Sequence, residues 1–185
     1  MNTKIITETP FGSVAIIWTY TGDIPKIVCV LLSKPEGPSE QQVSELYPKI
    51  NRSSCKDIDD VATGITSMLK GAEVDFPINV ADLSMCGEFQ QRVLRAEHAI
   101  PRGSVSTYRL IAQHLGKGNG ARAVGNALAK NPFPLIVPCH RTVRSDRSLG
   151  GYQGGLEMKR VLLEREGIRF DDAGKVQCLR FHYEI

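Results

Sequence analysis

The first third of the chain alternates short apolar runs with turns and predicts strands followed by helices. Residues 13–20 and 26–32 are apolar and rich in β-branched side chains, and the turn-forming stretch 21–25 lies between them. This arrangement predicts a β-hairpin. The spacing of apolar positions in 39–47 and 57–70 then predicts two helices.

The second half of the chain changes to a helical pattern. Phe89, Val93, Ala96 and Ile100 recur at helical spacing until a proline ends the pattern. Between the two regions, residues 72–86 predict a link with at most a short strand. No internal repeat or low-complexity tract interrupts this order.

Two short helices joined by a glycine-containing turn then indicate a helix-turn-helix. Ser106 or Thr107 can cap the first helix, and the second covers residues 121–130. The second helix is nearly bare of long side chains, so its backbone could approach a shallow surface such as a DNA minor groove. Tight packing between helices explains the same small residues equally well, and both interpretations remain open.

Length and composition indicate an ordinary globular protein. The 185 residues are 42% hydrophobic, which suits one domain or a small pair with a real core. Five widely spaced cysteines argue against a disulfide scaffold or a zinc finger, and no apolar run reaches membrane-spanning length. We therefore expect a monomer in the reducing cell interior, cytoplasmic or nuclear if eukaryotic, without metal, cofactor or membrane partner.

The net charge of +3 hides an uneven distribution of charged residues. Residues 1–100 hold nine Lys and Arg against thirteen Asp and Glu, whereas residues 101–170 hold twelve against four. Residues 171–185 hold two against three. The basic block predicts a polyanionic partner such as nucleic acid, although a merely solvated surface would have the same composition.

The strongest chemical signal is Cys139 beside His140, after a proline-rich turn and an apolar run. A thiolate is a strong nucleophile, and an imidazole is a common base for generating it, so we expect an unusually acidic Cys139 thiol. Neighbouring side chains on an extended segment point to opposite sides, which favours a water-bridged relay over direct contact. A buried, inert cysteine is the alternative when the dipeptide is considered alone.

Two charged residues lie on one face of the last helix that the sequence predicts. Lys159, Leu163 and Glu166 share one stripe at helical spacing, so the lysine and the carboxylate could both face the cysteine. Spacing alone would equally allow a solvated helix face.

Several motifs in order resemble the O6-alkylguanine-DNA alkyltransferases over residues 84–170. They are Arg122-Ala123-Val124-Gly125, Asn131-Pro132, Pro138-Cys139-His140-Arg141, Gly151-Tyr152-Gln153-Gly154-Gly155 and Leu162-Leu163-Glu164-Arg165-Glu166-Gly167. The resemblance implies an α+β fold. We expect an N-terminal RNase H-like α/β domain at 1–80, a helical domain with a plain or winged helix-turn-helix at 84–170, and a tail at 171–185.

The resemblance also implies a reaction and its catalytic residues. Cys139 would accept the alkyl group of O6-alkylguanine, and less readily of O4-alkylthymine, in double-stranded DNA, and the protein would be consumed. His140 would be the base, reached through a water and oriented by Glu166. Tyr108 would donate a hydrogen bond to the departing guanine, and Lys159 would complete the catalytic set.

The remaining assignments concern DNA and the base pocket. Arg122 would fill the space of an extruded nucleotide, and Asn131 would be a structural hinge. The other expected DNA contacts are Ala123, Gly125, Ala127 and Arg141. The expected pocket residues are Pro134, Tyr152, Gln153 and Gly154. Relatives often carry a small hydroxyl residue at the position of Gln153, so its bulk should narrow the pocket.

Three alternative functions share part of these features. A lesion-binding relative without repair activity would lack the acceptor cysteine, which Cys139 argues against. A cysteine hydrolase could use the same Cys, His and Glu residues but would turn over acyl substrates. A transcriptional regulator could use the same helix-turn-helix but would prefer one operator sequence.

Overall fold

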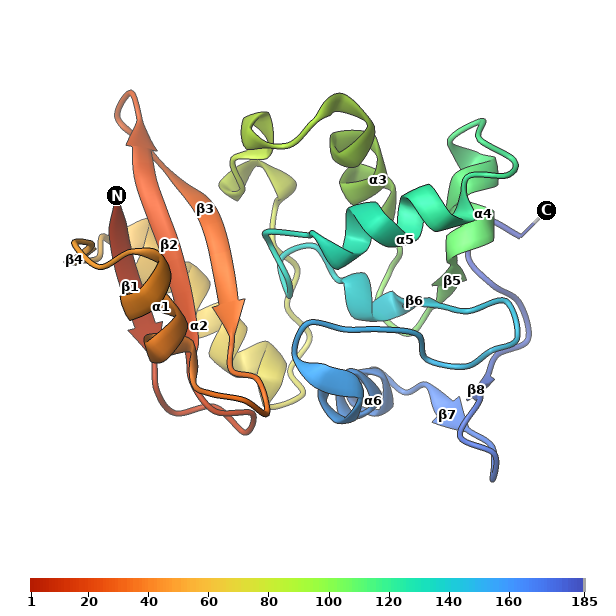
Figure 1. Cartoon of the computed structure of the whole chain (residues 1–185). Coiled ribbons are helices and arrows are strands. Elements are labelled where there is room, and N and C mark those ends of the chain that lie inside the picture. Colours follow the sequence, from red (N-terminus) through yellow and green to blue (C-terminus); the bar gives the residue numbers. More distant parts are fainter. Residues whose placement is uncertain (185) are drawn as a thin grey trace. The chain divides into compact units, whose positions relative to one another are not determined.

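The computed structural model describes residues 1–184 and divides them into two compact units. Unit 1 contains residues 1–85 and 132–136, and unit 2 contains residues 86–131 and 137–184 of the described chain. The broad class is mixed α/β, in agreement with the sequence, with the larger sheet in unit 1 and most helices in unit 2 (Figure 1).

Unit 1 is built on a four-stranded sheet in the order β3-β2-β1-β4. The predicted hairpin is present as β2 (Val14–Thr21) and β3 (Ile24–Leu32), joined by a tight turn in which Gly22 has a φ of 62°. β1 (Asn2–Ile6) pairs antiparallel with β2 and parallel with the short β4 (Asn51–Arg52). The sequence interpretation missed β1, because its five residues give too short a pattern to separate a strand from an irregular terminus.

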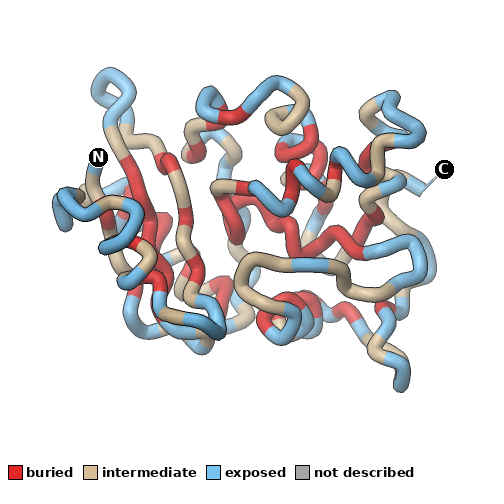
Figure 2. The backbone as a smooth tube through the Cα atoms, in the orientation of Figure 1, coloured by how far each residue is buried: buried red, intermediate tan, exposed pale blue. Residues whose placement is uncertain are grey.

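Most of the inner strand β2 is buried, as the red colour of the sheet in Figure 2 shows. Ala15 and Ile17 pack on Val43 of α1 (Ser39–Leu46). The alternate residues of β2 are equally buried, on the face toward α2 (Lys56–Leu69), whose Asp59 pairs with Lys4 of β1 at 2.8 Å. Helices on both faces explain why β2 is a continuous apolar run rather than an alternating one.

The link after α2 contains no strand in the described chain. It forms two 3-10 turns, η1 (Ile78–Val80) and η2 (Leu83–Met85), which lead into unit 2. Residues 132–136 return to unit 1, where the Val30 amide donates to the Pro132 carbonyl at 2.8 Å.

Unit 2 begins with three helices that pack on one another: α3 (Glu88–His98), α4 (Tyr108–His114) and α5 (Ala121–Ala129). Thr107 caps α4 as expected, because its hydroxyl accepts from the Leu110 amide at 3.1 Å. The 3-10 turn η3 (Cys139–Arg141) then leads into β6 (Thr142–Val143), which pairs parallel with β5 (Ser106–Thr107).

Unit 2 ends with α6 (Gly155–Arg165) and the small antiparallel pair β7 (Arg169–Phe170) and β8 (Val176–Gln177). Val176 lies in the same apolar cluster as Leu163 of α6. Residues that the sequence presents as a tail therefore contribute to the core of this unit.

Truncation of a buried side chain on strand β2 tests this account of unit 1. We expect Ile17→Ala to lower the free energy of unfolding by about 3 kcal/mol, because a fully buried isoleucine loses its contacts and leaves a cavity. Denaturant titration followed by the fluorescence of Trp18, the single tryptophan, measures this change. Lys49→Ala, at an exposed position of the same unit, is the control and should change stability by less than about 0.5 kcal/mol.

Candidate active site

The candidate nucleophile Cys139 and the candidate base His140 lie on a turn, the reactive turn Cys139–Arg141, and not on an extended strand. Residues Cys139–Arg141 form η3, and all three side chains are buried. This corrects the expectation that Cys139 and His140 point to opposite sides of an extended segment. The backbone turns because the Arg141 amide donates to the Pro138 carbonyl at 2.8 Å.

Glu166, the C-cap residue of α6, binds the side chains of the two residues that follow the cysteine. His140 Nε2 lies 3.0 Å from Glu166 Oε1, and Arg141 donates to both carboxylate oxygens through Nε (3.0 Å to Oε2) and Nη2 (2.9 Å to Oε1). Arg141 Nη1 also donates to the carbonyl of Ile100 at 2.7 Å. Arg141 is thus occupied inside unit 2, which corrects the expectation that it contacts DNA.

These contacts fix the charge states around His140. Burial alone would raise the pKa of Glu166, but the bonds from His140 and Arg141 prevail and lower it to about 2. Burial lowers the pKa of His140, so the imidazole is neutral at physiological pH. With Nε2–H donated to Glu166, Nδ1 is left as the proton acceptor, and it has no hydrogen-bond partner among residues 1–184.

The Cys139 thiol is not acidic in the resting structure. Burial raises its pKa to about 11, and a bond from Asn131 opposes this only in part. This corrects the expectation of an unusually acidic thiol. A protonated sulfur needs a base to become a nucleophile, and the free Nδ1 of His140 belongs to the next residue along the turn.

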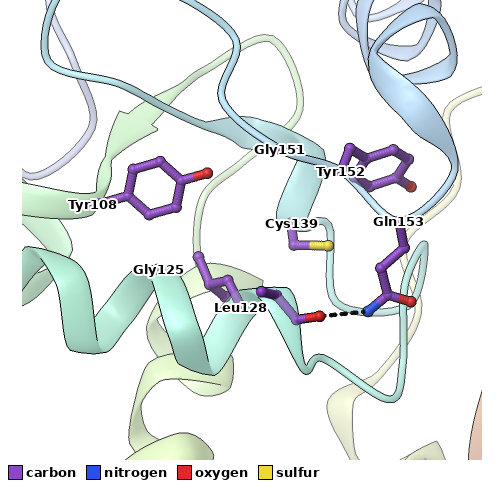
Figure 3. A pocket seen from close by; sticks show the side chains of 8 residues that line it. Tyr108, Gly125, Leu128, Cys139, Gly151, Tyr152 and Gln153 are labelled. Atoms are coloured by element: carbon purple, nitrogen blue, oxygen red, sulfur yellow. Dashed lines mark hydrogen bonds between the residues drawn. The ribbon is translucent and has the colours of Figure 1, made fainter.

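Cys139 lines a cavity of about 310 Å³ within unit 2 (Figure 3). Its other lining residues are Tyr108, Gly125, Leu128, Ala129, Gly151, Tyr152 and Gln153. The side chain of Gln153 donates to the carbonyls of Asn131 at 2.7 Å and Ala129 at 3.4 Å, so it is held as one wall of the cavity. Of the four expected pocket residues, Tyr152 and Gln153 line the cavity, whereas Pro134 is buried in unit 1 and Gly154 precedes α6.

Tyr108, the first residue of α4, presents a neutral phenol to this cavity. Burial raises its pKa to about 12, so the hydroxyl remains a hydrogen-bond donor at physiological pH. Gly150 has a φ of 70°, and a Cβ there would lie 2.9 Å from the Tyr108 hydroxyl oxygen. Only glycine therefore lets this loop pass so close to the phenol.

Lys159 is fully buried and joins two segments of the site. Its Nζ donates to the carbonyl of Thr142 at 2.6 Å and to that of Gly151 at 3.4 Å. Burial lowers its pKa to about 8, while the nearby Cys139 and Glu97 oppose the shift. The lysine thus links the strand after the reactive turn to the loop that walls the cavity.

The residues expected at a DNA surface divide into two groups. Arg122 and Ala123 are exposed near the start of α5, and Gly125 lies against the Tyr108 ring at the wall of the cavity. Ala127 is buried, which corrects its assignment as a DNA contact. Asn131, expected as a hinge, is buried and donates to the Val137 carbonyl at 3.1 Å.

The sequence interpretation missed Glu97, a buried carboxyl in α3. Its position carried a signal, because Glu97 falls four residues after Val93 and three before Ile100, on the apolar stripe of the helix. A charged residue on such a stripe has to find a partner inside the protein.

Among residues 1–184 no cluster of three His, Cys, Asp or Glu side chains could hold a metal ion. In that part of the chain there is also no helix long and apolar enough to cross a membrane.

Fold and site together define a class of protein: an α/β unit joined to a helical unit that holds a buried cysteine at a small cavity, with an oriented histidine next in the chain. Residues 88–168 match the family described as "6-O-methylguanine DNA methyltransferase, DNA binding domain".

Relatives and solved structures agree with this assignment. Methylated-DNA–protein-cysteine methyltransferases of Methanothermobacter thermautotrophicus and Mycobacterium leprae are 48% identical over 107 residues and 49% identical over 86 residues. The matches cover 58% and 46% of this chain, which spans 60% and 52% of those proteins. The Mycobacterium tuberculosis OGT in complex with DNA has a TM-score of 0.68 at 26% identity, over 90% of this chain and 92% of that one.

Removal of the Glu166 charge tests the electrostatics of this site. We expect Glu166→Gln to destabilise the protein at neutral pH by about 3 kcal/mol, because Arg141 loses its buried counter-charge. Since the pKa of Glu166 is depressed from 4.5 to about 2, its stabilising charge is complete above pH 4.5 and is lost as the pH falls through 2. Denaturant titrations should therefore give a difference between parent and variant that narrows over this interval.

The matched control is Glu164→Gln, an exposed carboxylate on the same helix that pairs with Arg160. It should change stability by less than about 0.5 kcal/mol at every pH. A Glu166→Gln deficit that stays constant from neutral pH to the lower end of the range would contradict the assigned pKa.

Proposed function

We propose that this protein repairs DNA by moving the alkyl group of O6-alkylguanine, and less readily of O4-alkylthymine, onto its own Cys139. The observation that carries the proposal is the cysteine at the cavity, followed directly by a neutral histidine whose Nε2 is held by Glu166. The match of residues 88–168 to the methyltransferase family supports the same reaction.

In the proposed reaction a bond forms between Cys139 Sγ and the alkyl carbon as the bond from that carbon to guanine O6 breaks. The thiol proton passes toward His140 Nδ1, through a water as relay, because the resting sulfur is protonated. The phenol of Tyr108 donates a hydrogen bond to the departing guanine. The guanine takes up one proton and the thiol gives up one, so the step consumes and releases no net proton. The thioether product has no easy reversal, so each molecule acts once and needs no cofactor or metal.

The partner would be double-stranded DNA, bound through α4 and α5 acting as a helix-turn-helix, plain or winged. Its support is the exposed Arg122 and Ala123 on a helix of small residues, together with the excess of basic residues in 101–170. The M. tuberculosis relative crystallised in complex with DNA adds to that support. A target base inside a duplex must be flipped out, and Arg122 is the residue suited to fill its place.

Unit 1 would be an RNase H-like domain in this interpretation. Its mixed sheet with helices on both faces is compatible with that fold. The domain boundaries would follow the family segment, with the alkyl-transfer and DNA-binding functions in residues 84–170.

Intact-protein and peptide mass spectrometry after mixing with a duplex that contains O6-methylguanine tests the reaction. We expect a gain of one methyl group on the peptide that contains Cys139, and no further turnover. Cys139→Ala should show no gain and still bind the duplex, because phosphate contacts do not need the thiol. Methyl transfer by Cys139→Ala would refute the proposal, and catalytic hydrolysis of acyl substrates by the parent would favour a cysteine hydrolase.

Arg122→Ala tests base extrusion separately from chemistry. It should slow reaction with the alkylated duplex by at least about tenfold while leaving reaction with the free base O6-benzylguanine nearly unchanged, since only the duplex requires extrusion. Arg109→Ala, an exposed arginine on α4, is a control for general loss of positive charge. Equal losses on both substrates would give Arg122 some other role.

A further inference from the structure

Glu97 is a buried carboxyl for which the proposed reaction has no use. It lies in α3 with its side chain fully enclosed in unit 2. The Thr142 hydroxyl donates to Oε2, whereas Oε1 has no hydrogen-bond partner among residues 1–184. A half-satisfied carboxyl in the interior costs stability, and such groups are enriched where their charge has a function.

Thr142 connects Glu97 to the cationic side of the site. Its hydroxyl bonds to the Glu97 carboxylate, and its carbonyl accepts from Lys159 Nζ at 2.6 Å. Thr142 follows the reactive turn directly, three residues after Cys139. A carboxyl and an ammonium group that do not touch each other are therefore joined through the residue that leads out of this turn.

Glu97 changes its charge in the physiological range. Burial raises its pKa to about 7, although the bond from Thr142 and the charges of Lys159 and Arg141 oppose the rise. The other titratable groups that sense its charge are the phenols of Tyr108 and Tyr183 and the thiol of Cys139. These groups come from α4, α6, the reactive turn and the C-terminal segment, so the charge of Glu97 is felt in four separate parts of unit 2.

We propose that Glu97 is a positioning residue that restrains Cys139: its carboxylate, tied through Thr142 to Lys159, keeps the sulfur in its protonated, slowly reacting form. The inference rests on the proposed function in one respect: the restraint slows alkyl transfer only if Cys139 is the acceptor of the alkyl group. The negative charge opposes formation of a thiolate nearby, and it acts against Lys159, whose positive charge favours the thiolate.

The test is the rate at which Cys139 is modified by iodoacetamide as a function of pH, measured peptide by peptide. In Glu97→Gln the Cys139 profile should move to lower pH by about one unit, the size of effect expected from removal of one nearby charge. Well above pH 7, where Glu97 of the parent carries its charge, this shift corresponds to a rate about tenfold higher than in the parent, and the difference narrows as the pH falls through 7. The profile of Cys178, a partly exposed cysteine of the same unit, should not move and is an internal control.

Three further variants separate charge from packing. Glu88→Gln, an exposed carboxylate on the same helix, should keep the parent profile. Thr142→Val removes the hydroxyl that stabilises the Glu97 anion and should shift the Cys139 profile in the same direction as Glu97→Gln, whereas Thr142→Ser keeps the hydroxyl and should restore the parent profile. The Thr142 pair tests the inference even if Glu97→Gln does not fold.

Stability provides a second readout. The pKa of Glu97 is raised from 4.5 to about 7, so the parent loses stability as the pH rises through this interval, and Glu97→Gln should gain relative to the parent over the same interval. Coincident Cys139 profiles for the parent and both Glu97→Gln and Thr142→Val would overturn the inference. Methyl transfer from the O6-methylguanine duplex is measured in parallel, and its absence in the parent would refute the proposed function while the iodoacetamide profiles still decide the role of Glu97.

Discussion

The geometry around the cysteine depends on one buried ion pair, between Arg141 and Glu166. The guanidinium binds both oxygens of the carboxylate and, through Nη1, the carbonyl that ends the α3 region at Ile100. Three separate parts of unit 2 are thereby held at one point: the reactive turn, the end of α6 and the residues after α3. Loss of either partner would leave an uncompensated charge inside the protein, which is strongly destabilising.

The same pair determines what His140 can do. Because Glu166 accepts a hydrogen bond from Nε2–H, the imidazole is fixed in the tautomer that leaves Nδ1 free to accept. Burial keeps the ring neutral, and a neutral ring with a free acceptor is the form a base requires. The ion pair therefore orients the imidazole and stabilises it for a proton transfer, as the carboxylate of a hydrolase triad does.

Two buried carboxyls in unit 2 show how bonding decides charge. Glu166 receives hydrogen bonds from His140 and Arg141 and has a pKa of about 2, whereas Glu97 receives one neutral bond from Thr142 and has a pKa of about 7. Glu97 is the more deeply buried of the two, so the difference comes from desolvation together with the number and charge of their donors. The first carboxyl is a permanent anion, and the second responds to pH beside the same thiol.

Local patterns in the sequence were enough to find the hairpin, the main helices and the cysteine. The β-branched runs of β2 and β3, the Thr107 cap and the glycine turn before α5 are short-range signals whose physical causes lie within a few residues. The residue types of the Pro-Cys-His-Arg stretch likewise indicated a candidate nucleophile beside a candidate base, with a buried, inert cysteine as the alternative. Strand β1 gave no such signal, because five residues acquire their pairing only when β2 lies beside them.

Charge states and contacts between distant segments required the folded chain. Arg141 has the positive charge expected of a DNA contact. It is an interior residue because Glu166, 25 residues away in the sequence, pairs with it in the folded chain. Cys139 resembles an activated thiol beside its histidine, yet its burial raises its pKa, because desolvation depends on every element packed around it. Glu97 and Thr142 are 45 residues apart, and their bond exists because α3 and β6 pack together in unit 2.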